Sequence, residues 1–202
     1  MGSALCAALC LAAATLFTLG AGERGTAAAL QLTARLSFLF FWPAYAGGAL
    51  AVLFGGKFRL LKARAREFGL AFAAAMLVHA GLIGWLCWIG DAPGRDTFLF
   101  FGIGLGWTYL IALASIGRLQ SLLGPKGWWL LRLVGLNYIA LAFAMDFFRK
   151  PLLTDARQIA GYLPFAVLTA AAPLLRLAAL GQRMRQGRGA ASPASAGQTL
   201  SA

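Results

Sequence analysis

The sequence predicts an all-α protein, a polytopic membrane bundle of six transmembrane helices with both its N- and C-terminus in the cytoplasm. Of the 202 residues, 60% are hydrophobic and only 12% are charged, so a soluble domain of this length could not cover its apolar surface. Six apolar stretches are each about as long as a helix needs to cross the bilayer. The basic residues lie between these stretches, with more of them on one side than on the other.

The predicted spans follow one another along most of the chain. They cover residues 3–19, 36–54, 68–89, 98–115, 129–148 and 159–180. No Lys or Arg precedes the first span, so we expect a retained helix rather than a cleaved signal peptide. Residues 20–35 are predicted to form a connector. In the second span, Pro43 is expected to kink the helix, and Gly47 and Gly48 leave room for a neighbouring helix.

Glycines, tryptophans and two polar side chains mark the later spans. The GIGLG run at residues 102–106 contains a GxxxG pair, which favours close helix packing in the fourth span. Trp128 and Trp129 stand where the fifth span begins, at the depth where interfacial aromatic residues are expected. Farther into this span, Asn137 and Tyr138 are expected to hydrogen-bond neighbouring helices.

The chain is predicted to form one transmembrane domain, residues 1–180, followed by a tail. Residues 181–202 begin with arginines and continue with Ser, Ala, Gly and Gln. Because this composition offers almost no apolar side chains to bury, we predict that the tail is disordered.

The distribution of Lys and Arg predicts the orientation. One side of the predicted topology carries twelve of them, namely Lys57, Arg59, Lys62, Arg64, Arg66, Arg118, Lys126, Arg132, Arg176, Arg183, Arg185 and Arg188. The other side carries six, namely Arg24, Arg35, Arg95, Arg149, Lys150 and Arg157. The positive-inside rule therefore puts both termini in the cytoplasm. Because the net charge of +12 lies between apolar spans, we expect anionic lipid headgroups as partners and no nucleic acid.

His79, the only histidine in the sequence, lies near the middle of the third span. An ionisable side chain at this depth is energetically expensive and marks a functional site by default. Its spacing from Phe68, Phe72 and Met76 places all four residues on one helix face. From the residues alone, three roles stay open for His79: a hydrogen bond to a neighbour, ligation of haem iron, or transfer of protons or ions.

Two segments resemble a known family. Residues 64–81, RAREFGLAFAAAMLVHAG, are similar to the third helix of the ferric-reductase-like transmembrane domain family. This family includes the haem-binding membrane subunit of the bacterial periplasmic methionine sulfoxide reductase system. Gly69 and Leu70 correspond to the family's Leu-Gly-Leu-like run, and His79 falls at the position of a haem-ligand histidine. Residues 128–143, WWLLRLVGLNYIALAF, resemble the family's Trp-rich start of the fifth helix.

The resemblance covers most of residues 36–180 and implies a function. It implies haem b bound between the third and fifth helices, and electron transfer in a multi-pass protein of a bacterial inner (plasma) membrane. His79 would be an axial ligand of the haem iron. Arg132, near the inner end of the fifth span, can reach phosphate headgroups, or a haem propionate if haem is present. Such a protein would be the membrane component of an oxidoreductase. Because the chain has no flavin or nicotinamide domain, it would need a donor or acceptor protein, or quinol.

The chain also departs from the family pattern. The fifth predicted span contains no histidine, and Leu131 stands where the family has its second ligand. Met145 is the thioether that could replace it, with plain packing as the alternative for this side chain. Helical rises of about 1.5 Å per residue place His79 roughly 16 Å and Met145 roughly 24 Å from the inner helix ends, so pairing them needs tilt or offset.

The missing histidine leaves two functional hypotheses open. The first is a haem-binding electron carrier of the ferric-reductase-like type. The second is a haem-free structural or assembly subunit derived from the same fold. Whether the protein is part of an enzyme depends on this choice. A transporter of small solutes is disfavoured, because the spans offer no polar pathway.

Overall fold

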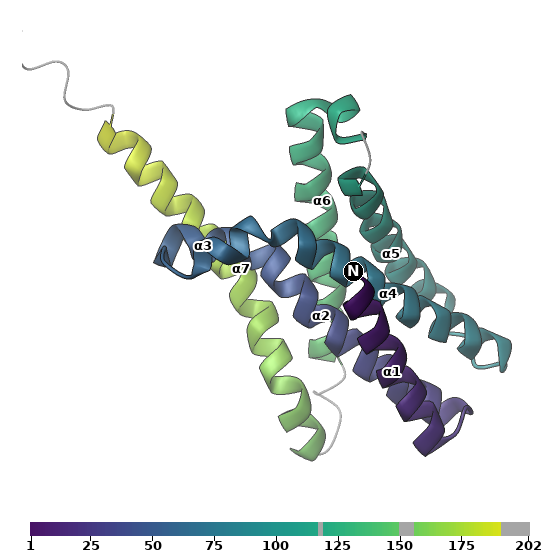
Figure 1. Cartoon of the computed structure of the whole chain (residues 1–202). Coiled ribbons are helices and arrows are strands. Elements are labelled where there is room, and N and C mark those ends of the chain that lie inside the picture. The colour runs from purple at the N-terminus through teal and green to yellow at the C-terminus, as the bar shows by residue number, and fades with distance from the viewer. Residues whose placement is uncertain (117–118, 150–155, 191–202) are drawn as a thin grey trace, which may run out of the picture.

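A computed structural model describes residues 1–116, 119–149 and 156–190 of the chain (Figure 1). In this part of the chain there are seven helices and no strand, namely α1 (Gly2–Leu19), α2 (Glu23–Phe54), α3 (Phe58–Ala63), α4 (Ala65–Trp88), α5 (Arg95–Ile116), α6 (Leu119–Arg149) and α7 (Ala156–Ala190). Six of them are long and apolar enough to cross a membrane. The predicted class is confirmed: this is an all-α, multi-pass membrane protein. The orientation of its termini stays a prediction.

The segment predicted as a connector between the first two spans is mostly helical, because α2 begins already at Glu23. Glu23 lies in the first turn, where a negative charge is favourable beside the helix N-terminus. The tight turn from α1 into α2 requires glycine. A Cβ atom on Gly25 would lie 1.8 Å from the carbonyl oxygen of Gly20, which itself has a φ of 86°.

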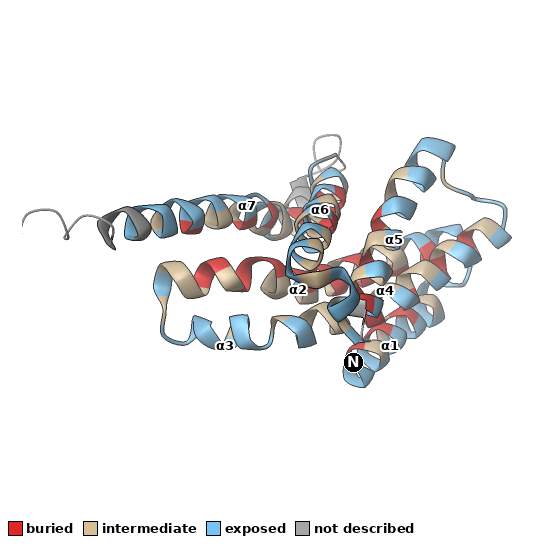
Figure 2. Ribbon diagram, turned by 90° about the horizontal axis from the view of Figure 1, so that it is seen from above, coloured by how far each residue is buried: buried red, intermediate tan, exposed pale blue. Residues whose placement is uncertain are grey.

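The basic loop between the second and third predicted spans contains the short helix α3. Gly55 and Gly56 turn the chain into it with φ values of 59° and 49°, which favour glycine. Figure 2 shows α3, which is mostly exposed, beside α2. The contact forms at Gly47, where an added Cβ would lie 3.1 Å from the Cβ of Leu61. The neighbouring helix that Gly47 admits is therefore α3, whereas Gly48 has no atom within 4 Å of an added Cβ.

The later helices differ from the prediction in the packing of α5 and in the length of α7. In α5, the packed glycine is Gly104, whose added Cβ would contact Tyr138 and Ala142 of α6. Gly102 and Gly106, the predicted GxxxG pair, have no such neighbour within 4 Å, so the expected role of this pair is wrong. Helix α6 breaks at Gly124, where φ is 62°. Helix α7 continues past residue 180 to Ala190, and residues 191–202 of the predicted tail lie outside the described residues.

Helix α2 is the centre of the bundle and packs against α1, α3, α4 and α7. Figure 2 shows the buried residues concentrated along it and its neighbours. Alanines let α1, α2 and α4 approach closely, and the most buried of these are Ala8, Ala29 and Ala75, each 0% exposed. Small residues at such interfaces allow extensive van der Waals contact, which holds helices together within a bilayer.

Polar and aromatic side chains of α2 hold α7 in place. Gln31 donates a hydrogen bond to the hydroxyl of Tyr162. The guanidinium of Arg35 lies over the ring of the same tyrosine, 4.6 Å from its centroid. Farther along, the indole N–H of Trp42 donates to the carbonyl oxygen of Leu168 at 2.8 Å. These contacts explain why polar residues occur in the first half of a helix that lies inside the bundle.

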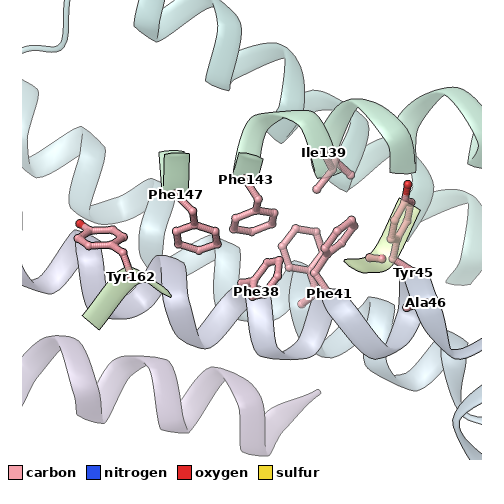
Figure 3. Close-up of a cluster of buried hydrophobic side chains, with 10 residues drawn as sticks. Phe38, Phe41, Tyr45, Ala46, Ile139, Phe143, Phe147 and Tyr162 are labelled. Carbon is pink, nitrogen blue, oxygen red and sulfur yellow. The ribbon is translucent and has the colours of Figure 1, made fainter. Parts of the chain in front are cut away.

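A row of aromatic rings forms the core between α2, α6 and α7 (Figure 3). The ring of Phe38 on α2 lies 5.1 Å from those of Phe143 and Phe147 on α6, centroid to centroid. Phe72 of α4 joins the same cluster through Phe41, at 5.3 Å. Edge and offset contacts of this kind stabilise aromatic pairs beyond simple burial.

Candidate functional site

His79 is half-buried on α4 and contacts α2 through a hydrogen bond. Its Nδ1 atom lies 3.0 Å from the hydroxyl oxygen of Thr33, a fully buried residue. The single hydroxyl proton of Thr33 is directed at the carbonyl oxygen of Ala29, 2.8 Å away. With that proton donated to Ala29, the Thr33 oxygen accepts from Nδ1–H of His79, so the direction of the second bond follows the tautomer of the imidazole. This bond orients the imidazole ring relative to α2.

Several residues near His79 on α4 are apolar and belong to the two buried clusters. On its own helix, Val78 and Leu82 belong to the cluster that α4 forms with α1 and α2. Phe72 and Met76, which share its helix face, pack in or against the aromatic core. An imidazole in such surroundings needs a polar partner, because an unpaired polar group at this depth is unfavourable. Thr33 meets this need.

Met145 lies on the outer side of α6. Its side chain is 43% exposed, whereas Phe143 and Phe147, two residues before and after it, are buried in the aromatic core. Residues two apart on a helix point about 200° apart, so Met145 faces away from the core. The structure thus does not place its sulfur atom opposite His79.

Arg132 lies at a third place, on the wall of a partly open cleft of about 920 Å³. Parts of α2, α3, α4, α5, α6 and α7 line this cleft. Neither His79 nor Met145 is among its lining residues. The three residues that the family resemblance connects with haem therefore lie apart. These positions do not fit a haem held between two axial ligands of this chain.

The cleft, which we call the basic cleft, is lined by five cationic side chains, namely Lys62, Arg66, Arg132, Arg176 and Arg183. None of the described residues that line it is acidic. Two aromatic side chains hold the arginines by cation–π contacts: Arg176 lies 4.3 Å from the ring centroid of Tyr45, and Arg132 lies 5.6 Å from that of Trp128. Arg66 donates to the carbonyl oxygen of Ser115 at 2.7 Å, close to the C-terminal end of α5.

Asn137 connects three helices in the wall of the basic cleft. Its Oδ1 atom accepts hydrogen bonds from the Tyr45 hydroxyl at 2.6 Å and from Arg176 Nη1 at 3.3 Å. Its Nδ2 atom donates to the carbonyl oxygen of Leu133 at 2.6 Å. The hydroxyl of Tyr138 donates to the carbonyl oxygen of Phe100 on α5 at 3.0 Å. The interhelical hydrogen bonds expected of Asn137 and Tyr138 are confirmed.

Sequence reasoning did not foresee the basic cleft. The distribution of Lys and Arg predicted the orientation and anionic lipid headgroups as partners, but not that cations of separate helices line one cleft. One feature of the sequence could have indicated the basic cleft: cations of three separate segments lie on one predicted side of the membrane, while nearly all acidic residues lie elsewhere. No family model matches this chain, and neither a curated protein nor a solved structure matches it. The functional argument therefore rests on the geometry of these residues.

Proposed function

We propose that this protein is a haem-free structural or assembly subunit of a bacterial inner membrane, derived from the ferric-reductase-like type of fold. The separation of His79, Met145 and Arg132 carries the proposal. A haem with two axial ligands needs them on opposite faces of one porphyrin, with the propionates at one edge. Here His79 contacts α2, Met145 faces outward and Arg132 lines the basic cleft.

The aromatic core supports the same proposal. The family resemblance implies a haem between the helices that correspond to α4 and α6. In this chain, rings bridge these helices: Phe72 of α4 and Phe143 of α6 lie 6.0 Å apart, centroid to centroid. Phe41 of α2 contacts both, at 5.3 Å and 5.4 Å. At this level α4 and α6 are therefore joined by packed protein side chains.

A second candidate function is haem binding through His79 alone. The hydrogen bond between Nδ1 and Thr33 favours it, because metal-ligating histidines usually donate their other ring N–H to a protein oxygen. Bound haem b would supply one-electron redox chemistry. Within this chain, Thr33 would hold the imidazole ring in place, and a second ligand and a redox partner would have to come from outside the chain.

An absorption spectrum separates the two candidates. The protein would be produced with a haem precursor supplied, purified in mild detergent and reduced with dithionite. We expect no Soret band and no b-type peaks above background, and no difference between the wild type and His79→Ala. A reduced b-type spectrum that is lost in His79→Ala but kept in Met145→Leu would overturn the proposal and establish the second candidate.

A further inference from the structure

We propose that the basic cleft binds one anionic phospholipid, with its phosphate-bearing headgroup held by the cations and its acyl chains lying along the apolar wall. This inference does not depend on whether the protein binds haem. Its starting observation is that five cations from four helices line one cleft while no acidic residue does, within the part of the chain that the structure describes.

The charges in the basic cleft favour an anionic occupant. Arg132 and Arg176 both line it, and their like charges repel each other. Cationic side chains within a transmembrane bundle are expensive unless they are paired or reach water. A phosphate group accepts several charge-assisted hydrogen bonds at once, and arginine matches its geometry with two parallel N–H donors. A bound phosphate would thus offset the repulsion.

The deeper wall of the basic cleft favours an amphiphile over a small soluble anion. Phe41, Phe72 and Ile139 line it there, and all three belong to the aromatic core. Trp128 and Trp129 also line it, and tryptophan prefers the level of lipid headgroups. A molecule that satisfies both regions needs an anionic head and an apolar chain. A membrane phospholipid has both.

The residues around the headgroup position are already oriented. Arg176 is held between Asn137 and the Tyr45 ring, and Arg66 is held by the carbonyl oxygen of Ser115. Such preorganisation improves affinity, because fewer side chains lose freedom on binding. The volume of about 920 Å³ is also within the range of sites for small molecules. It accommodates a headgroup and the first part of its chains.

Brominated lipids provide a direct test, because bromine quenches nearby tryptophans and two tryptophans line the basic cleft. The purified protein would be titrated in detergent with dibromostearoyl phosphatidylglycerol and, separately, with phosphatidylcholine carrying the same chains. We expect quenching by the anionic lipid to saturate at a concentration at least about tenfold lower, because phosphatidylcholine carries the same phosphate but adds a choline cation, which the five cations of the basic cleft repel. Equal quenching by both lipids would overturn the proposal.

Matched variants locate the binding site. The double variant R132Q/R183Q should abolish the preference for the anionic lipid. The double variant K57Q/R59Q removes the same charge on the same predicted side of the membrane, but these residues do not line the basic cleft, so it should keep the preference. The variant R132K keeps the positive charge at this position and should keep most of the preference. It therefore separates the loss of charge in R132Q/R183Q from a general effect of changing residue 132. Loss of the preference in both double variants alike would contradict the proposed site.

Soluble anions distinguish a lipid from free phosphate. Inorganic phosphate and glycerol phosphate, added at millimolar concentration, should leave the quenching by brominated phosphatidylglycerol unchanged. Competition by either anion at the same concentration as the lipid would show a soluble-phosphate site and overturn the assignment to a phospholipid.

Discussion

The hydroxyl oxygen of Thr33 on α2 and Nδ1 of His79 on α4 lie 3.0 Å apart within the bundle. This hydrogen bond joins the central helix to the helix that carries the only histidine of the chain. It gives His79 a structural role in holding α2 and α4 together, whether or not the imidazole has a further ligand.

A double-mutant cycle measures this role. We expect Thr33→Val and His79→Ala each to destabilise the protein, with a coupling free energy of about 0.6 kcal/mol and at most about 1.7 kcal/mol, as found for hydrogen bonds between transmembrane helices. Unfolding by a denaturing detergent would give the four free energies. Additive effects of the two substitutions would show that the bond contributes nothing.

The aromatic core should dominate the stability of the α2–α6 contact. Phe38 is 1% exposed, and we expect Phe38→Ala to lower the free energy of unfolding by roughly 3 kcal/mol, because it leaves a cavity among four rings. Phe17 on α1 is 93% exposed and serves as the control. Phe17→Ala should change stability only slightly. Similar losses in both variants would contradict the position of the core.

Two adjacent glycines of α2 test the docking of α3. Gly47→Leu should displace α3, because an added Cβ already lies 3.1 Å from that of Leu61. We expect a loss of about 1–3 kcal/mol, typical of overpacking, and faster proteolysis within residues 55–64. An added Cβ at Gly48 has no neighbour within 4 Å. Gly48→Leu should therefore leave the free energy of unfolding and the rate of proteolysis close to those of the wild type. Equal proteolysis of the two variants would refute this packing.

Reporter fusions test the orientation. A fusion after Gly56 should report the cytoplasm, because this loop carries the largest group of cations. A fusion after Asp96, in the first turn of α5 and therefore beyond α4, should report the opposite side. If both fusions report the same side, α4 does not cross the membrane.

The sequence predicted the class of the fold because six long apolar runs have few alternatives to helices that cross a bilayer. It did not predict the extent of α2, because residues 20–35 mix polar and apolar side chains. In the structure, Thr33 contacts His79 of α4, while Gln31 and Arg35 contact Tyr162 of α7, so these three polar residues have partners on neighbouring helices. Such partners depend on the tertiary arrangement, which the sequence pattern does not encode.

The site was harder to predict than the fold. His79 was identified because a lone ionisable residue in an apolar span is informative by itself. The basic cleft was not, because its cations come from α3, α4, α6 and α7 and meet only when the helices assemble. For Met145, the helical rise predicts the depth of the residue in the membrane but not the direction of its side chain. The structure shows that this side chain faces outward.

The imidazole signals of His79 test the central claim most directly. Because this is the only histidine, the protein labelled with nitrogen-15 histidine gives the NMR signals of one imidazole ring. We expect a protonated Nδ1, a shift of its signal in Thr33→Val, and unchanged, sharp signals after one equivalent of haemin is added. Selective loss or paramagnetic broadening of these signals on adding haemin would show that His79 binds iron, and would contradict a haem-free protein.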